Sequence, residues 1–173
     1  MVKKIFWLLF SITIGNLTIA QLFKTNQTLN LPKTLNLISL DVGKIERCNY
    51  VVDSICPTII IFWLSSSNES IKMLDVIDEN YSKWIKNNEF RVIAISNDKL
   101  NSRNVCRAIV EKHKWKFEFF FDDKNELKDA ILGDWQGIPQ LFIVDNKAKV
   151  LLHHYGYNAD DENKIIEVIK KKK

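Results

Sequence analysis

Residues 58–70, with the sequence TIIIFWLSSSNES, constrain the fold of this chain more than any other stretch. The first six are β-branched or aromatic, as in a strand that helices cover on both faces. Serines and an acid follow, and apolar residues then recur at helical spacing, at Ile71, Leu74, Ile77, Tyr81 and Trp84. The pattern predicts a buried strand, a tight turn and an amphipathic helix. Free backbone N–H groups and the dipole at such a helix start favour a negative charge.

Later apolar runs predict further strands that alternate with helices. Residues 90–96 (FRVIAIS) and 115–121 (WKFEFFF) are typical of strands. Residues 102–113 and 125–132 are predicted helices, the second ending at Gly133. Val105, Ala108 and Ile109 are expected on the buried side of the first of these helices.

The C-terminal part predicts two strands and a helix. The sequence Gly-Ile-Pro at 137–139 precedes an apolar strand at 140–145, and a short turn separates it from a strand at 150–155. Two strands joined so tightly must be antiparallel. Asn158 is expected to cap a last helix that presents Ile165, Ile166 and Ile169. The whole pattern predicts an α/β fold.

The order and spacing of these motifs resemble the thioredoxin fold, and most closely the TlpA-like thiol-disulfide oxidoreductases. Members of that family end their first core strand in F-W-x-x-W-C-x-x-C. Aligning Phe62 and Trp63 with this F-W places Ser66 on the second tryptophan and Ser67 and Ser70 on the two cysteines. The resemblance spans residues 31–170. It implies a central mixed β-sheet flanked by helices on both faces, with a cis-proline at Pro139 before the antiparallel strand pair.

The resemblance also implies a shallow groove that binds an extended peptide beside the turn. The positions that match the groove are Trp63, Ser66, Trp135, Gln136, Ile138 and Pro139. Aromatic side chains near exposed backbone donors suit peptide binding. The alternative for each tryptophan is packing in the core, where large aromatic side chains are usually buried.

The serine turn is not expected to be catalytic. Ser67 and Ser70 cannot carry out dithiol exchange, because a hydroxyl ionises too weakly and forms no disulfide. A serine hydrolase would need a base from His113, His153 or His154, and adjacent strand residues such as the last two point to opposite faces. Instead, Ser66-x-x-Glu69 has the spacing of a capping box.

Three cysteines remain in the chain. A disulfide between Cys48 and Cys56 would stabilise the fold by roughly 2–3 kcal/mol in the chain-entropy model. The alternative is a relocated redox pair, but neither residue lies at the predicted helix N-terminus that would activate a thiolate. Cys106 is expected to be a buried, inert thiol. No Cys-x-x-Cys or His-x-x-x-His spacing is present, so we predict no metal and no cofactor.

The N-terminus predicts export. Lys3 and Lys4 precede an apolar run at 5–14, and Ala20 precedes a polar residue, which is typical of a secretory signal peptide at 1–20. An uncleaved membrane anchor is the alternative, although the run is shorter than the roughly 20 apolar residues of a membrane span. We expect an N-terminal extension with a short strand at 21–57 and the thioredoxin-like domain at 58–173.

These features together predict an exported thioredoxin-like protein in the periplasm or another extracytoplasmic space. They favour a protein without dithiol redox activity and with a non-enzymatic role. It would bind an extended peptide or exported protein, or act as a scaffold; a membrane is a partner only if residues 1–20 are kept. The alternative is a thiol-disulfide oxidoreductase that uses Cys48, Cys56 or Cys106. Removal of Lys3 and Lys4 lowers the net charge from +4 to +2, which argues against a nucleic-acid surface.

Overall fold

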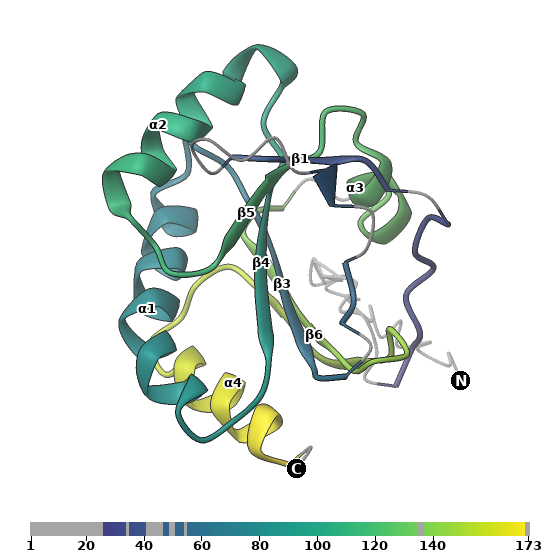
Figure 1. The fold of residues 1–173 in the computed structure, drawn as a ribbon, viewed down its shortest axis with the longest axis vertical. Helices are drawn as coiled ribbons and strands as arrows, with labels where there is room; N and C mark the ends of the chain where they lie inside the picture. Colours follow the sequence, from purple (N-terminus) through teal and green to yellow (C-terminus); the bar gives the residue numbers. More distant parts are fainter. Residues whose placement is uncertain are drawn as a thin grey trace, which may run out of the picture.

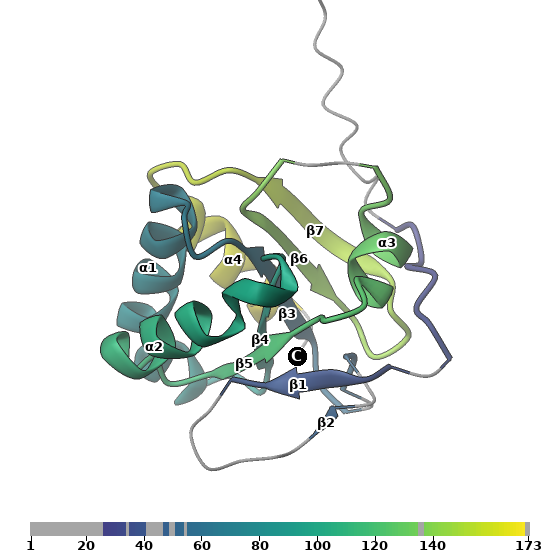
Figure 2. The same ribbon diagram turned by 90° about the horizontal axis from the view of Figure 1, so that it is seen from above.

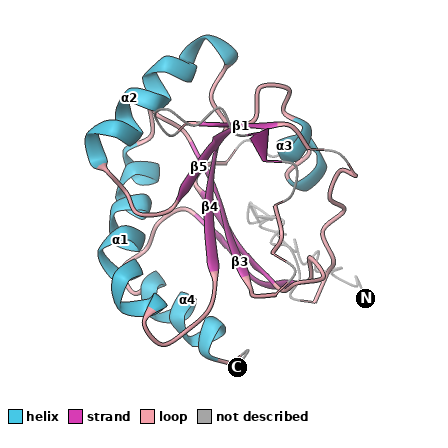
Figure 3. Cartoon of the chain, in the orientation of Figure 1, coloured by secondary structure: helices cyan, strands magenta, loops and turns pink. Residues whose placement is uncertain are grey.

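The computed structural model describes residues 26–33, 35–40, 47–48, 51–53, 55–134 and 137–171, with the backbone alone at 47–48. Seven strands form one mixed sheet in the order β2-β1-β5-β4-β3-β6-β7. Figures 1 and 3 show the central strands of this sheet with helices on either side. The strands are β1 Leu37–Ser39, β2 Arg47–Cys48, β3 Thr58–Trp63, β4 Arg91–Ser96, β5 Glu118–Phe121, β6 Gln140–Val144 and β7 Val150–Tyr155. The helices are α1 Asn68–Ile85, α2 Arg103–His113, α3 Glu126–Ile131 and α4 Asp161–Lys170, with a short 3-10 helix η1 at Leu100–Ser102.

Strand β3 lies between a parallel and an antiparallel neighbour. It runs parallel to β4, with Thr58 opposite Arg91, and antiparallel to β6, with Phe62 opposite Gln140. Strands β6 and β7 form an antiparallel hairpin, so the predicted antiparallel pairing is confirmed. We call the end of the sheet where β3 and β4 finish the turn end, and the opposite end, which carries the β6–β7 turn, the hairpin end.

Helices cover both faces of the sheet, as the sequence predicts. Helices α1, α2 and α4 lie on one face and α3 on the other (Figure 2). Alternation along β3 divides its side chains between two cores: Ile59, Ile61 and Trp63 pack on the first face, and Ile60 and Phe62 on the second. All six residues of β3 are buried, which explains its uninterrupted apolar sequence.

The segment before β3 belongs to the same sheet. Strand β1 pairs antiparallel with β5, with Ile38 opposite Phe121, and β2 pairs with β1. Further upstream, the Asn26 N–H donates to the carbonyl of Val150 at 2.8 Å. The described part of the predicted extension therefore adds strands and hydrogen bonds to the central sheet. Residues 1–20 lie outside the described part of the chain.

Strand β5 begins at Glu118, later than the predicted start at 115. Side chains of α1 form hydrogen bonds with the residues just before the strand. Asp75 Oδ1 accepts a hydrogen bond from Trp115 Nε1 at 2.8 Å, and Asp78 Oδ1 accepts one from the Lys116 N–H at 2.7 Å.

The predicted buried side of α2 was wrong in part. Cys106 and Val110 are buried, whereas Val105 is 53% exposed and Ala108 is also exposed. Only Ile109 packs partly against the core. Helical spacing predicts which residues share one side of α2, but it does not predict which side faces the sheet. In the structure the side with Cys106 faces it, and Cys106 contacts Ser96 and Asp98 at the turn end.

Asn158 does not cap α4 as expected. The N-cap position is Asp160, which has φ +74° and makes no side-chain capping bond. The carboxylate of Asp161 instead accepts a hydrogen bond from the Asn158 N–H at 2.6 Å. Across the described residues, no helix has the length and apolar character needed to cross a membrane.

Candidate functional site

The serine turn joins β3 to α1 and is held by its own hydroxyl groups. Ser67 is the N-cap of α1, and its Oγ accepts a hydrogen bond from the Ser70 N–H at 3.1 Å. Ser70 is fully buried, and its Oγ accepts one from the Leu64 N–H at 3.2 Å. The predicted capping box at Ser66 and Glu69 was therefore wrong by one residue. Because α1 starts at Asn68, Ser66 is one position too early to cap it and is exposed.

Asp98 clamps the turn to the end of β4. Its carboxylate accepts hydrogen bonds from the Ser65 N–H at 2.9 Å and the Ser65 hydroxyl at 2.6 Å. It also accepts one from the Ser96 hydroxyl at 2.9 Å. Sequence reasoning missed Asp98 and Ser65 as site residues, because 33 positions separate them. The only signal was the Asn97-Asp98 pair that ends the predicted strand.

Cys106 lies beneath this network as a buried thiol. Its Sγ is 3.3 Å from both Asp98 Oδ2 and Ser96 Oγ. Burial raises the pKa of the Cys106 thiol to about 11, the dominant cause being loss of solvent around the thiolate. The thiol is therefore protonated at neutral pH and is a poor nucleophile. The expectation of a buried Cys106 is confirmed.

Pro139 directly precedes β6 at the turn end. The Ile138–Pro139 peptide bond is cis. Because Gln140 pairs with Phe62, Pro139 lies just beyond the pair, beside the end of β3. Pro139 is buried, and its carbonyl accepts a hydrogen bond from the Gly156 N–H at 2.9 Å, while Ile138 is partly exposed. The Gln140 side chain donates to the Gly137 carbonyl at 2.7 Å and so braces this loop.

Trp63 packs in the core and does not line a groove. Its side chain is fully buried, and its ring contacts those of Trp115 and Phe119 edge to face, with centroids 6.2 and 5.9 Å apart. Alternation along β3 places it on the helix-covered face. The predicted groove position was therefore wrong for Trp63. Trp135 and Gln136 lie outside the described residues.

Large apolar side chains are nevertheless exposed near the turn. Tyr155 is 44% exposed and stands opposite Gln140 in the β6–β7 ladder. Leu100 is 64% exposed and lies in η1, two residues after Asp98. Both belong to the turn end. Sequence reasoning missed both as candidate contacts, because exposure of an apolar residue depends on neighbours that are distant in the chain.

The three histidines are bound to partners other than the serine turn. His153 Nε2 is 3.0 Å from Gln140 Oε1, and its ring stacks on Phe142. His154 contacts Asp161 at 2.7 Å, and His113 contacts Asp75 at 3.1 Å. Burial lowers the pKa of His153 to about 4, and the neighbouring His154 adds a smaller effect. With Ser67 Oγ engaged by the Ser70 N–H, this geometry provides no serine–histidine pair.

Cys56 lies at the other end of the sheet, just before β3. It is partly exposed and has no disulfide partner among the described side chains, and its N–H donates to Asp53 Oδ1 at 3.3 Å. Burial, followed by the charges of Asp53 and Glu89, raises the pKa of this thiol. The side chain of Cys48 lies outside the described part of the structure, so the Cys48–Cys56 disulfide stays a prediction. Among the described residues, no cluster of His, Cys, Asp and Glu is suited to a metal ion.

Comparison with known proteins supports the fold. No protein-family model matches the chain, and no curated protein matches its sequence. Among solved structures, an uncharacterized thioredoxin-like protein from Porphyromonas gingivalis is 26% identical, with a TM-score of 0.66 over 84% of this chain and 93% of that one.

Two further structures are similar in fold. The thioredoxin domain of a thiol-disulfide oxidoreductase from Bacteroides vulgatus is 15% identical, with a TM-score of 0.65 over 85% of this chain and 99% of that one. A thiol:disulfide interchange protein from Bacteroides sp. is 16% identical, with a TM-score of 0.64 over 83% and 91%. The chain therefore has a thioredoxin-like fold, and its structural neighbours include thiol-disulfide oxidoreductases.

Proposed function

We propose that this chain is an exported, TlpA-like thioredoxin-fold protein in which Ser67 and Ser70 replace the two redox cysteines. It binds an extended peptide or a segment of another exported protein at the turn end, and it does not catalyse dithiol exchange. The N-terminal charge and apolar pattern at 1–20 supports export to a periplasmic or other extracytoplasmic space.

The observation that carries this proposal is the use of both hydroxyls as structural acceptors. Ser67 Oγ and Ser70 Oγ each accept a backbone hydrogen bond that fixes the turn. Dithiol exchange needs an accessible thiolate at this position, which a serine cannot supply. Cys106 is buried close by, with its pKa raised to about 11.

Binding of a peptide is supported by the rigid, partly apolar surface around the turn. Asp98 fixes the turn through two hydrogen bonds from Ser65 and is itself held by one from Ser96 of β4, so the surface is preorganised. Tyr155, Leu100 and the partly exposed Ile138 supply apolar contact area. Such a surface suits an extended chain whose alternate side chains point toward it. Ser66, Trp135, Gln136 and Pro139 remain part of the proposed groove.

A relocated redox cysteine is the second candidate, and the partly exposed Cys56 is the residue that would carry it. Its position at the hairpin end separates it from the turn, and its raised pKa reduces the thiolate fraction. An insulin-reduction assay distinguishes the two hypotheses. We expect no activity, and activity that disappears in Cys56→Ala would favour the second candidate.

The binding hypothesis is tested with a library of unstructured peptides. We expect Tyr155→Ala to weaken the selected peptides by about tenfold, as for an aromatic contact at the centre of an interface. Ile55→Ala removes an exposed apolar side chain at the opposite end and serves as the matched control. Failure to select any peptide, or equal weakening by both variants, would contradict binding at the turn end.

A further inference from the structure

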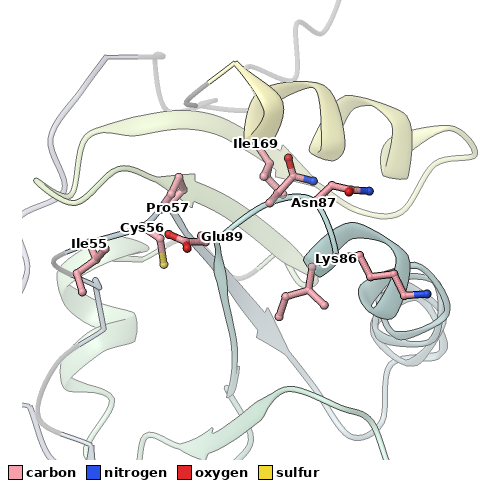
Figure 4. Close-up of a pocket in the computed structure, with 9 residues that line it drawn as sticks. Ile55, Cys56, Pro57, Lys86, Asn87, Glu89 and Ile169 are labelled. Carbon is pink, nitrogen blue, oxygen red and sulfur yellow. The ribbon is translucent and has the colours of Figure 1, made fainter.

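The hairpin end carries a shallow pocket of about 540 Å³. It lies where the end of α1, the segment before β3 and the end of α4 meet (Figure 4). Its lining is formed by Ile55, Cys56, Pro57, Ile85, Lys86, Asn87, Asn88, Glu89 and Ile169. None of these residues belongs to the candidate site at the turn end.

Two isoleucines of this pocket are exposed. Ile55 is 81% exposed and Ile85 is 43% exposed. The position of Ile55 is fixed, because its N–H donates to Asp53 Oδ1 at 2.7 Å. Exposed apolar side chains that line one pocket are typical of a surface that contacts a membrane or another protein.

Exposed lysines surround the isoleucines. Lys86 follows the last residue of α1 and lines the pocket, while Lys170 is the last residue of α4 and Lys171 its C-cap, directly after Ile169 in the chain. Lys147 is exposed in the β6–β7 turn at the same end of the molecule. Two more lysines follow Lys171 in the sequence. The lining of the pocket contains one acidic residue, Glu89. Basic side chains beside apolar ones fit an anionic, partly apolar surface.

The N-terminal part of the chain joins the domain at this end. The Asn26 N–H donates to the Val150 carbonyl, and the Val150 N–H donates to the Gln27 carbonyl at 2.7 Å. Val150 pairs with Val144, which pairs with Thr58 at the start of β3. The 25 residues that precede Asn26 include the apolar run at 5–14. Where residues 1–20 are kept as an anchor, this apolar segment would bring the exposed isoleucines and lysines toward a membrane.

We propose that the hairpin end is a membrane-docking surface that rests on an anionic lipid bilayer. Ile55 and Ile85 enter the headgroup region, while Lys86, Lys147, Lys170 and Lys171 contact lipid phosphates. The turn end then faces away from the bilayer. This surface is separate from the proposed peptide groove, so either proposal can fail without the other.

Lysine footprinting of the full chain tests the orientation. The protein is bound to vesicles of an equal mixture of phosphatidylcholine and phosphatidylglycerol, and acetylation is followed by mass spectrometry. We expect acetylation of Lys86, Lys170 and Lys171 to fall about tenfold relative to the vesicle-free protein, because lipid phosphates shield them. Lys99, exposed at the turn end, should react as before. Equal protection at both ends, or none at the hairpin end, would overturn the proposal.

A matched pair of double variants tests the apolar contact. Ile55→Ser with Ile85→Ser should reduce sedimentation with the mixed vesicles by about tenfold and abolish the footprint at Lys170. Leu100→Ser with Val105→Ser removes two exposed apolar side chains from the other end of the domain and should change neither readout. Circular dichroism confirms that both variants fold. The proposal fails if the Ile55→Ser, Ile85→Ser variant still sediments with the vesicles and still shows protection of Lys170. It also fails if the unaltered protein binds vesicles of phosphatidylcholine alone equally well, because the N-terminal segment would then act without this surface.

Discussion

Individual hydroxyl groups decide what the turn end can do. Ser67 and Ser70 sit where the backbone N–H groups of α1 begin, and each accepts one hydrogen bond. A thiolate at this position would be stabilised by the same N–H groups and by the helix dipole. In this structure Ser67 caps α1, and Ser70 ties the backbone of Leu64 to the first turn of the helix.

The double variant Ser67→Cys with Ser70→Cys is expected to form a disulfide under mild oxidation. The Ser70 N–H already points to the side chain at 67, so the first thiol should have a pKa below its ordinary value. Alkylation rates against pH measure this pKa, and thiol titration measures the disulfide. Ser66→Cys with Ser70→Cys is the control, since Ser66 is exposed and lies before the cap. Equal behaviour of the two pairs would show that the turn does not activate position 67.

Asp98 is expected to be the most sensitive polar residue of the turn. Asp98→Ala leaves the Ser65 N–H and two hydroxyls without their acceptor, and we expect a loss of about 2–4 kcal/mol in the free energy of unfolding. Urea unfolding measures the change. Asp129→Ala removes an exposed carboxylate that contacts Lys128 Nζ at 3.2 Å and should change stability by less than about 0.5 kcal/mol. A small effect at Asp98 would mean that the clamp is not needed for the fold.

At the scale of elements, strands β6 and β7 hold the loop that contains Pro139. His153 of β7 contacts Gln140 of β6, and Gln140 donates to the Gly137 carbonyl. Burial keeps the imidazole neutral by lowering its pKa to about 4. The loop is therefore braced through a buried histidine that is neutral at pH 7.

Acid is expected to destabilise the protein through His153. The ordinary pKa is 6.5 and the folded value is about 4, so the unfolded chain binds more protons between these pH values. The contribution is fully present above pH 6.5 and is lost as the pH falls through about 4. His153→Gln cannot titrate and should flatten this part of the stability profile in urea unfolding at stepped pH. An unchanged slope would assign the acid sensitivity to other groups, and His113→Gln controls for removal of a histidine at a helix end.

At the scale of the whole molecule, the two described thiols lie in different environments. Cys106 is buried beneath the turn end, and Cys56 is partly exposed at the hairpin end. The turn end would bind a peptide, while the hairpin end would contact lipid. The sheet therefore separates two surfaces with different proposed partners.

Thiol reactivity should follow this arrangement. In a Cys48→Ser background, one thiol is expected to react with a disulfide reagent in the native protein, and the second only after denaturation, because Cys106 is buried and its pKa is about 11. Adding Cys56→Ser should remove the fast reaction, whereas Cys106→Ala should leave it intact. Rapid reaction of Cys106 in the native state would contradict the structure of the turn end.

The sequence alone determined strands β3, β4, β6 and β7, the antiparallel pairing of β6 with β7 and the position of the serine turn, because these depend on local periodicity and on short connections. It did not show β2, the partners of β1 or the start of β5. The apolar run at β3, the short β6–β7 turn and Pro139 at the mouth of β6 were all visible along the chain. Only the tertiary structure decided that Trp63 is core, that Ser67 and not Ser66 is the cap, and that Asp98 clamps Ser65. Burial and long-range hydrogen bonds arise from residues far apart in sequence, and a shift of one residue in a helix start changes which hydroxyl is used.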